Sequence, residues 1–326
     1  MPVPVPAPVL VGIDIGASKL ALALGDESGR PTSHWRRAME ATDRPADDLA
    51  RIAEDVRELL AGAGKTAADV DWIGVSAPGP MDRERGLLLQ PPNLPGWKDV
   101  PIQSTLAEAL GAPVRLENDA NAAVLAEWRH GAGQGFENVV YLTASTGIGA
   151  GLVLGGRLHR GRRGNAGEIG HAPVEWDGAR CVCGQRGCLE AYVGGAAWTR
   201  RLREITPESS QVARLAGDVT RVRPEHVVAA AKQGDVFARS EMDRFNRYLA
   251  RAIVTLAFAL EPDVVVLGTI PVSAGEALCF APLRERVAAQ VWPVLGRDLQ
   301  ILPAALGFEL PYYAGLCLAL EGRQGR

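Results

Sequence analysis

The fold is decided by residues 9–24, which read VLVGIDIGASKLALAL. Residues 9–15 are almost entirely apolar, residues 16–19 form a short polar turn, and residues 20–24 are apolar again. Apolar runs of this length on both sides of a Gly-containing turn are typical of two buried strands joined by a hairpin. We therefore expect a strand, a tight turn and a second strand at the start of the chain.

A similar arrangement recurs in residues 138–154, which read NVVYLTASTGIGAGLVL. Apolar spacing also predicts other elements after each copy. These are an amphipathic helix within 43–62, strands at 71–76 and 114–117, an Ala-rich helix ending at Gly131, a long helix at 245–260, a strand at 264–267 and a closing helix at 316–320. The sequence thus predicts an α/β protein with a divergent internal duplication, in which a ligand cleft separates two similar halves.

Composition excludes several classes of protein. The 326 residues are 47% hydrophobic and 22% charged, which is typical of a globular chain of about two domains. A net charge of -3 gives no support to nucleic-acid binding. The prolines in residues 1–8 exclude a signal peptide, and the longest apolar run, 252–260, is far shorter than the roughly 20 residues that span a bilayer. We expect a soluble, cytoplasmic protein that contacts neither nucleic acid nor membrane.

Both polar turns carry groups that could bind phosphate. Residues 14–19 offer backbone N–H groups, a hydroxyl, an ammonium group and one carboxylate, Asp14, that could hold hydrated magnesium. Residues 145–149 read STGIG and offer similar groups. An ordinary β-turn would explain either copy alone, whereas two matched copies favour phosphate binding.

Asp119 has two interpretations. It follows Asn118 at the start of the Ala-rich helix, so its carboxylate could simply cap that helix. It could instead face the cleft and take the proton from a hydroxyl that attacks a phosphate. The residue pattern around Asp119 does not choose between them.

A metal site is the strongest local signal. His171, Cys181, Cys183 and Cys188 lie within eighteen residues and match a tetrahedral Cys3His zinc site. A disulfide plus a free thiol is disfavoured by the spacing and by a reducing compartment. Because four protein ligands leave no position open for water, the predicted zinc is structural.

With these motifs in view, the chain resembles the ROK family of the actin-like ATPase and sugar-kinase superfamily. The most specific segments are GEIGH at 167–171 and CVCGQRGCLE at 181–190, together with ENDANA at 117–122. The resemblance runs from about residue 9 to the end of the chain. It implies two actin-like (ribonuclease H-like) domains: a small domain at 9–116 with a helix of about 305–326 packed on it, and a large domain at 117–304 that carries the zinc. Residues 1–8 are expected to form a flexible tail.

The resemblance also implies a role for each site residue. Asp119 is implied to be the catalytic base, and ATP, Mg²⁺ and Zn²⁺ are the implied cofactors. The implied nucleotide and phosphate ligands are Asp14, Gly16, Ser18, Lys19, Ser145, Thr146, Gly147, Gly149 and Gly268. The implied sugar ligands are Asn93, Asn118, Asp119, Glu168, His171 and Glu190, with His171 serving both zinc and sugar. A homodimer or homotetramer is implied as well.

The chain departs from the family pattern at three loops. Ala17 and Ser18 replace Gly and Thr in the first phosphate loop, which requires a negative φ at Ala17, and Ser145 and Ala150 replace glycines in and beside the second. The loop on the adenosine side, usually a glycine pair or triplet, reads GTIP at 268–271. The extra bulk there bears on the affinity and the identity of the nucleotide, and not on the phosphate chemistry.

The function implied by these residues is that of an ATP-dependent hexose kinase acting on a primary hydroxyl. The segment NLPGW at 93–97 and Glu168 look like the glucokinase branch, so glucose is the expected acceptor, and Trp97 could stack on the sugar ring. N-acetylmannosamine, N-acetylglucosamine, fructose, allose, kanosamine or a sugar-like cyclitol are alternative acceptors. A non-catalytic sugar sensor is an alternative of another class. Because eight residues precede the first predicted strand, we do not expect the DNA-binding helices of a repressor.

Overall fold

The computed structural model describes residues 9–16 and 18–325, and these residues divide into two compact units. Unit 1 contains residues 9–130 and 308–325, and unit 2 contains residues 131–307. The expected tail at 1–8 and the expected negative φ at Ala17 lie outside the described residues. Unit 1 is therefore built from two separate stretches of chain, whereas unit 2 is continuous.

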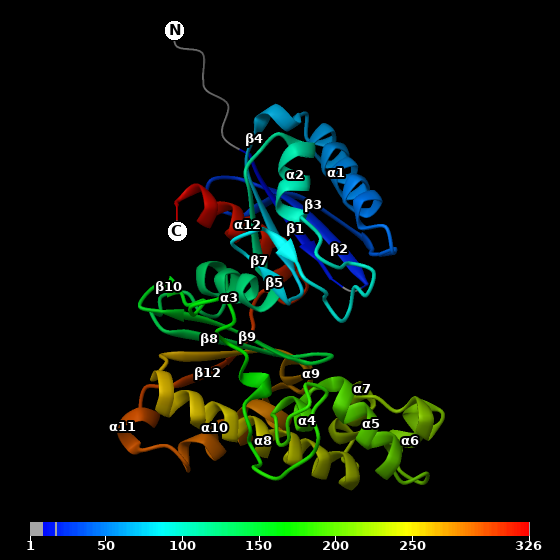
Figure 1. The fold of residues 1–326 in the computed structure, drawn as a ribbon. Coiled ribbons are helices and arrows are strands. Elements are labelled where there is room, and N and C mark those ends of the chain that lie inside the picture. Colours follow the sequence, from blue (N-terminus) through cyan, green and yellow to red (C-terminus); the bar gives the residue numbers. More distant parts are fainter. Residues whose placement is uncertain (1–8, 17, 326) are drawn as a thin grey trace. The chain divides into compact units, whose positions relative to one another are not determined.

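Unit 1 contains one five-stranded sheet with the order β3-β2-β1-β4-β7 (Figure 1). Its strands are β1 (Val9–Ile15), β2 (Lys19–Gly25), β3 (Pro31–Ala38), β4 (Val70–Ala77) and β7 (Val114–Asn118), with a small ribbon of β5 (Met81–Asp82) and β6 (Leu87–Leu88). Its helices are α1 (Pro45–Gly62), η1 (Ala67–Asp69), α2 (Ile102–Leu110), α3 (Asp119–His130) and α12 (Leu310–Arg323). β1, β4 and β7 are parallel, and β2 and β3 complete the sheet in antiparallel pairs.

Unit 2 contains a second five-stranded sheet with the order β10-β9-β8-β11-β12. Its strands are β8 (Val139–Ala144), β9 (Ile148–Leu154), β10 (Arg157–Leu158), β11 (Val264–Thr269) and β12 (Gln300–Pro303). Its helices are η2 (Ile169–His171), α4 (Glu190–Val193), α5 (Gly195–Ile205), α6 (Gln211–Ala216), η3 (Val219–Arg221), α7 (Pro224–Lys232), α8 (Val236–Leu260), α9 (Ile270–Gly275), η4 (Glu276–Phe280), α10 (Ala281–Ala288) and α11 (Pro293–Gly296). The short helix η5 (Gly307–Glu309) leads back to unit 1.

The two sheets have the same strand order and the same strand directions. In each, an antiparallel hairpin (β1–β2 or β8–β9) is joined to two parallel strands on one side and to one antiparallel strand on the other. This repeat confirms the internal duplication and the predicted pair of actin-like α/β domains.

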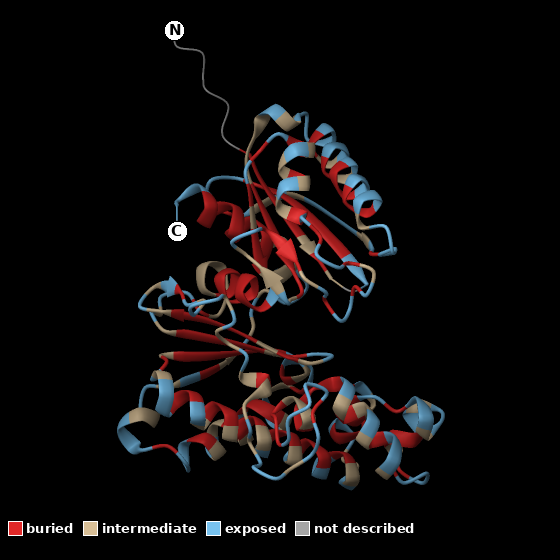
Figure 2. Ribbon diagram, in the orientation of Figure 1, coloured by how far each residue is buried: buried red, intermediate tan, exposed pale blue. Residues whose placement is uncertain are grey.

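Each sheet is buried against helices (Figure 2). In unit 1, alternate side chains of β1 and β2 point to α1 and α2, and the others point to α12. In unit 2, one face of the sheet packs against a large apolar cluster that includes α5, α7, α8 and α10. Because both faces of the unit 1 sheet are covered at β1 and β2, these two strands read as nearly continuous apolar runs rather than as alternating ones.

Helix α12 lies unusually close to the sheet of unit 1. A Cβ atom added to Gly74 of β4 would stand 2.0 Å from the carbonyl oxygen of Gly315, and one added to Gly315 would stand 2.6 Å from Cα of Gly12 in β1. Helix and strands therefore meet backbone to backbone. Only glycine at these positions permits that approach.

The boundary between the units differs from the expected one. The sequence places it at residue 117, before the helix that follows the ENDANA motif, whereas α3 belongs to unit 1. α3 continues directly from β7 and packs on α12. Since α12 is far from α3 in the chain, this packing could not be read from local sequence.

Among the described residues, no helix combines the length and the apolar character needed to cross a membrane.

We expect Gly74→Ala to destabilise the protein by about 1 to 3 kcal/mol or more, because the new methyl group forces α12 away from β4. Urea unfolding measures this change. Gly62→Ala, at the end of α1 where nothing lies within 4 Å of the new Cβ, is the matched control and should leave stability unchanged or slightly raised. Equal stabilities for the two variants would contradict the close approach of α12.

Candidate active site

Polar side chains gather where the three parallel strands of unit 1 end. Asp14 of β1 pairs in register with Ser76 of β4, and Ala77 of β4 pairs with Asn118 of β7. The Ser76 hydroxyl donates a 2.6 Å hydrogen bond to Oδ1 of Asp14. Ser76 was not predicted as a site residue, because a serine at the end of an apolar strand carries no signal until its cross-strand partner is known.

The pKa of Asp14 is raised toward neutral pH. Burial raises the pKa of Asp14 from its ordinary value of 3.8 to about 7, although the hydrogen bond from Ser76 lowers it. The nearby carboxylate of Asp119 raises this pKa further, and the guanidinium of Arg36 lowers it slightly. Two carboxylates close enough to repel each other form a site that favours a cation.

The turn after Asp14 brings together the residues of unit 1 that were predicted to bind phosphate. The backbone N–H of Gly16 donates to the carbonyl oxygen of Lys19 at 2.8 Å and closes the turn. The side chains of Ser18 and Lys19 are exposed beside it. An ammonium group and a hydroxyl next to Asp14 suit a metal-bound phosphate.

Asp119 is the first residue of α3 and is exposed. Its own Oδ1 and that of Asn118 both accept the backbone N–H of Ala120, at 2.8 and 2.9 Å. Beneath them the fully buried Glu117 accepts hydrogen bonds from the Asn118 N–H and from Asn121, and pairs with Arg83 at 3.1 Å. The cap interpretation and the functional one are thus compatible, since the capping carboxylate stays open to solvent.

Trp97 is buried and therefore cannot provide the sugar-stacking surface that its place in a loop suggested. Its side chain is 0% exposed, and its indole N–H donates to the buried Asp48 of α1 at 3.1 Å. Gly96 lies against the backbone of residues 42 and 43, which leaves no room for a side chain. Trp97 therefore packs in the core and holds in place the loop on which Asn93 is exposed.

The second predicted phosphate turn, in unit 2, is tied to helices on two sides. The N–H groups of Gly195 and Ala196, at the start of α5, donate to the carbonyl oxygens of Ser145 and Thr146 at 2.8 and 2.9 Å. The N–H of Ile148 donates to Oε2 of Glu190 at 2.9 Å. The side chains of Ser145 and Thr146 remain exposed, while Gly147 and Gly149 are half-buried.

His171, Cys181, Cys183 and Cys188 come together in unit 2. Their potential ligand atoms all lie within 4.8 Å of one another, including 3.7 Å from Cys181 Sγ to His171 Nδ1 and 3.7 Å from Cys183 Sγ to Cys188 Sγ. The sulfur atoms are too far apart for a disulfide, which requires about 2.05 Å. Three thiols and one imidazole are the donor set that zinc prefers, so the residues fit this ion. Cys279 and Cys317 are buried elsewhere, where burial raises the pKa of each thiol to about 12.

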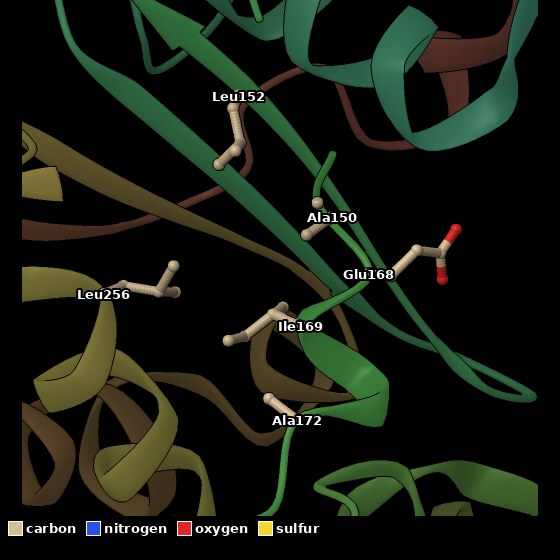
Figure 3. Close-up of a pocket in the computed structure, with 7 residues that line it drawn as sticks. Ala150, Leu152, Glu168, Ile169, Ala172 and Leu256 are labelled. Carbon is tan, nitrogen blue, oxygen red and sulfur yellow. The ribbon is translucent and has the colours of Figure 1, made fainter. Parts of the chain in front are cut away.

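Glu168 lies just before η2 and beside a cavity of about 320 Å³ that the sequence did not predict. The lining of this cavity is otherwise apolar and consists of Ala150, Leu152, Gly167, Ile169, Ala172 and Leu256. Figure 3 shows the Glu168 carboxylate pointing away from these apolar side chains. Glu168 is exposed and available to a polar ligand.

The loop at 268–271, which was expected to face adenosine, has a backbone conformation that glycine prefers. Thr269 has φ 59°, and its hydroxyl lies within hydrogen-bonding distance of the Ala144 carbonyl oxygen and 3.3 Å from the Thr143 hydroxyl. For a β-branched residue such a φ is a strained outlier that its surroundings must hold in place. Gly268 packs against the Tyr141 hydroxyl, only 2.5 Å from where a Cβ would stand. The expected bulk is present, and the side chain of Thr269 is exposed.

Comparisons with known proteins cover both units. The sequence profile of the ROK family matches residues 10–312. The glucokinase of Thermotoga maritima is 40% identical over 299 residues, which make up 91% of this chain and 92% of that protein. A ROK hexokinase structure from Thermus thermophilus has a TM-score of 0.80 with 36% identity, and a ROK glucokinase structure from Streptomyces griseus, in complex with glucose and AMPPNP, has a TM-score of 0.77 with 33% identity. Each structural match covers 97% of this chain and all of the other.

We expect Asp14→Asn to stabilise the magnesium-free protein at pH 8 by roughly 2 to 4 kcal/mol more than at pH 4.5. The unfolded wild-type chain loses the Asp14 proton near pH 3.8, whereas the folded protein holds it to about pH 7. Wild-type stability therefore falls as the pH rises through this window, and the uncharged amide of the Asp14→Asn variant removes that loss. Urea unfolding of both proteins in EDTA measures it, and a difference that is constant with pH would show that Asp14 titrates normally.

Proposed function

The chain belongs to the ROK family, and we propose that it is an ATP-dependent glucokinase that transfers the γ-phosphate of ATP to the primary hydroxyl of glucose. The observation that carries this proposal is the pair of carboxylates in unit 1, in which the exposed Asp119 raises the pKa of Asp14. The exposed carboxylate of Asp119 is suited to accept a proton, and the carboxylate of Asp14 is suited to bind a cation. Support for glucose comes from the glucokinase of Thermotoga maritima and from the glucose-bound glucokinase of Streptomyces griseus.

In the proposed reaction Asp119 accepts the proton of the sugar hydroxyl as its oxygen attacks the γ-phosphorus. The bond between that phosphorus and the bridging oxygen of the β-phosphate breaks, and ADP leaves. Magnesium, when bound, neutralises phosphate charge, and Asp14 is the residue that would hold its hydration shell. Lys19, Ser18 and the backbone N–H groups of the turn would stabilise the same charge.

The remaining expected ligands have assigned roles in this proposal. The second turn, through Ser145, Thr146, Gly147 and Gly149, binds donor phosphates, and Gly268 contacts the adenosine. The sugar hydroxyls are bound by Asn93, Asn118, Glu168, His171 and Glu190. The exposure of Asn93 and Glu168 supports these roles, because both side chains are accessible.

We expect Asp119→Asn to lower kcat by about 10² to 10⁴-fold, because the amide cannot accept the proton. A coupled assay of ADP formation from Mg-ATP measures it with glucose, mannose, fructose, allose, kanosamine, both N-acetylhexosamines and a cyclitol. Asp99→Asn, an exposed site whose φ of 50° asparagine tolerates, is the matched control and should retain wild-type turnover.

Three results would contradict the proposal in different ways. Near wild-type turnover by folded Asp119→Asn would exclude Asp119 as the base. Turnover by the wild type with another sugar alone would replace glucose. No turnover with any sugar, in a protein whose melting temperature glucose still raises, would favour the non-catalytic sensor.

We further propose that His171, Cys181, Cys183 and Cys188 bind one structural zinc ion. The clustering of all four ligand atoms within 4.8 Å supports a closed tetrahedral site. Because Nδ1 is the imidazole atom near Cys181, Nε2 would be left for the sugar. The zinc would thereby hold His171 in its orientation.

We expect Cys183→Ser to abolish stoichiometric zinc binding and to lower the melting temperature, since a bound structural zinc contributes folding free energy. Metal analysis and thermal unfolding measure the two effects. Cys279→Ala, a buried cysteine outside the cluster, controls for general destabilisation and should retain zinc. If Cys183→Ser keeps both its zinc and its melting temperature, the metal assignment is wrong.

A further inference from the structure

Glu190 contacts the second phosphate turn although the proposed function assigns it to the sugar. Its Oε2 accepts the Ile148 N–H at 2.9 Å, and the same atom lies only 2.5 Å from where a Cβ on Gly147 would stand. A side chain at position 147 would displace the carboxylate. The absence of a side chain at Gly147 therefore lets Glu190 reach the turn.

The chain around Glu190 is bonded to the turn at further points. Glu190 begins α4, and a few residues later Gly195 and Ala196 donate to the carbonyl oxygens of Ser145 and Thr146. A Cβ on Gly195 would stand 2.2 Å from the Ser145 oxygen, so the two backbones touch. Residues 190–196 and residues 145–148 thus form one hydrogen-bonded assembly within unit 2.

The charge of Glu190 opposes the ligand that this turn is proposed to bind. Its carboxylate occupies a backbone N–H at the turn and places a negative charge beside any phosphate. A sugar hydroxyl that donates a hydrogen bond to Glu190 would partly neutralise the carboxylate. The repulsion between Glu190 and a phosphate at the turn would then be weaker. Binding of the neutral ligand would therefore improve binding of the anionic one.

We propose that Glu190 couples the two substrates, so that sugar bound to its carboxylate tightens the binding of the phosphoryl donor at the turn of residues 145–149. This inference rests on the proposed function, which supplies both ligands. Coupling of binding free energies is reciprocal, so the donor tightens sugar binding by the same factor.

Calorimetric titration of Mg-AMPPNP, with and without saturating glucose, tests the coupling. For the wild type we expect glucose to lower the Kd of AMPPNP by about fivefold or more. In Glu190→Gln, which keeps the shape and an oxygen to accept from Ile148, we expect tighter AMPPNP binding without glucose and a ratio of the two Kd values close to 1. An unchanged ratio in this variant would overturn the proposal.

Gly147→Ala provides a second test that leaves the carboxylate in the chain. By displacing Glu190 it should raise the Kd of glucose several-fold, even though residue 147 belongs to the phosphate turn. Gly62→Ala, in unit 1, is the control and should change neither Kd. If Gly147→Ala changes the Kd of AMPPNP and leaves the Kd of glucose unchanged, Glu190 does not couple the two sites. This test does not require Glu190→Gln to bind glucose, so it remains decisive if that variant has lost glucose binding. A wild type that binds no AMPPNP or no glucose would instead overturn the proposed function.

Discussion

The backbone contact between α12 and the sheet of unit 1 is the constraint on which unit 1 depends. Gly315 lies against Gly12 of β1 and Gly74 of β4, so the helix fixes the spacing of these two parallel strands from one face. Asp14 and Ser76 stand at the ends of the same strands, in register and hydrogen bonded. Close packing without side chains thus sets the geometry of a carboxylate whose pKa is shifted to about 7.

Much of the fold could be predicted because its signals are local. The hairpins at 9–24 and 139–154 are contiguous apolar runs around short turns, and their repetition predicted the matching sheets. Strand β3 escaped prediction because most of its side chains are exposed, and it carries no apolar run. The unit boundary was misplaced because the packing of α3 on α12 joins residues that are far apart in the chain.

The candidate site likewise contains features that local sequence predicts and features that depend on contacts between distant residues. The four residues of the His/Cys cluster lie within eighteen positions, so their spacing alone indicates shared ligation. Trp97 was misinterpreted because its partner, Asp48, is 49 residues away, and an aromatic side chain in a loop shows nothing of its burial. The bond from Ile148 to Glu190 spans 42 residues, and Ser76 meets Asp14 across 62. Long-range pairs of this kind become visible only when the chain is folded.

The discontinuity of unit 1 has a consequence for synthesis on the ribosome. Unit 2 is continuous, so it can fold as soon as residue 307 has emerged, whereas unit 1 must wait for residues 308–325. Until α12 arrives, the glycine-lined face of β1 and β4 has no cover, and the strand ends that carry Asp14 and Ser76 lack their final support. A nascent chain therefore completes the half with the His/Cys cluster before the half with the two carboxylates. Premature termination before α12 would leave exposed apolar sheet for chaperones and proteases to recognise.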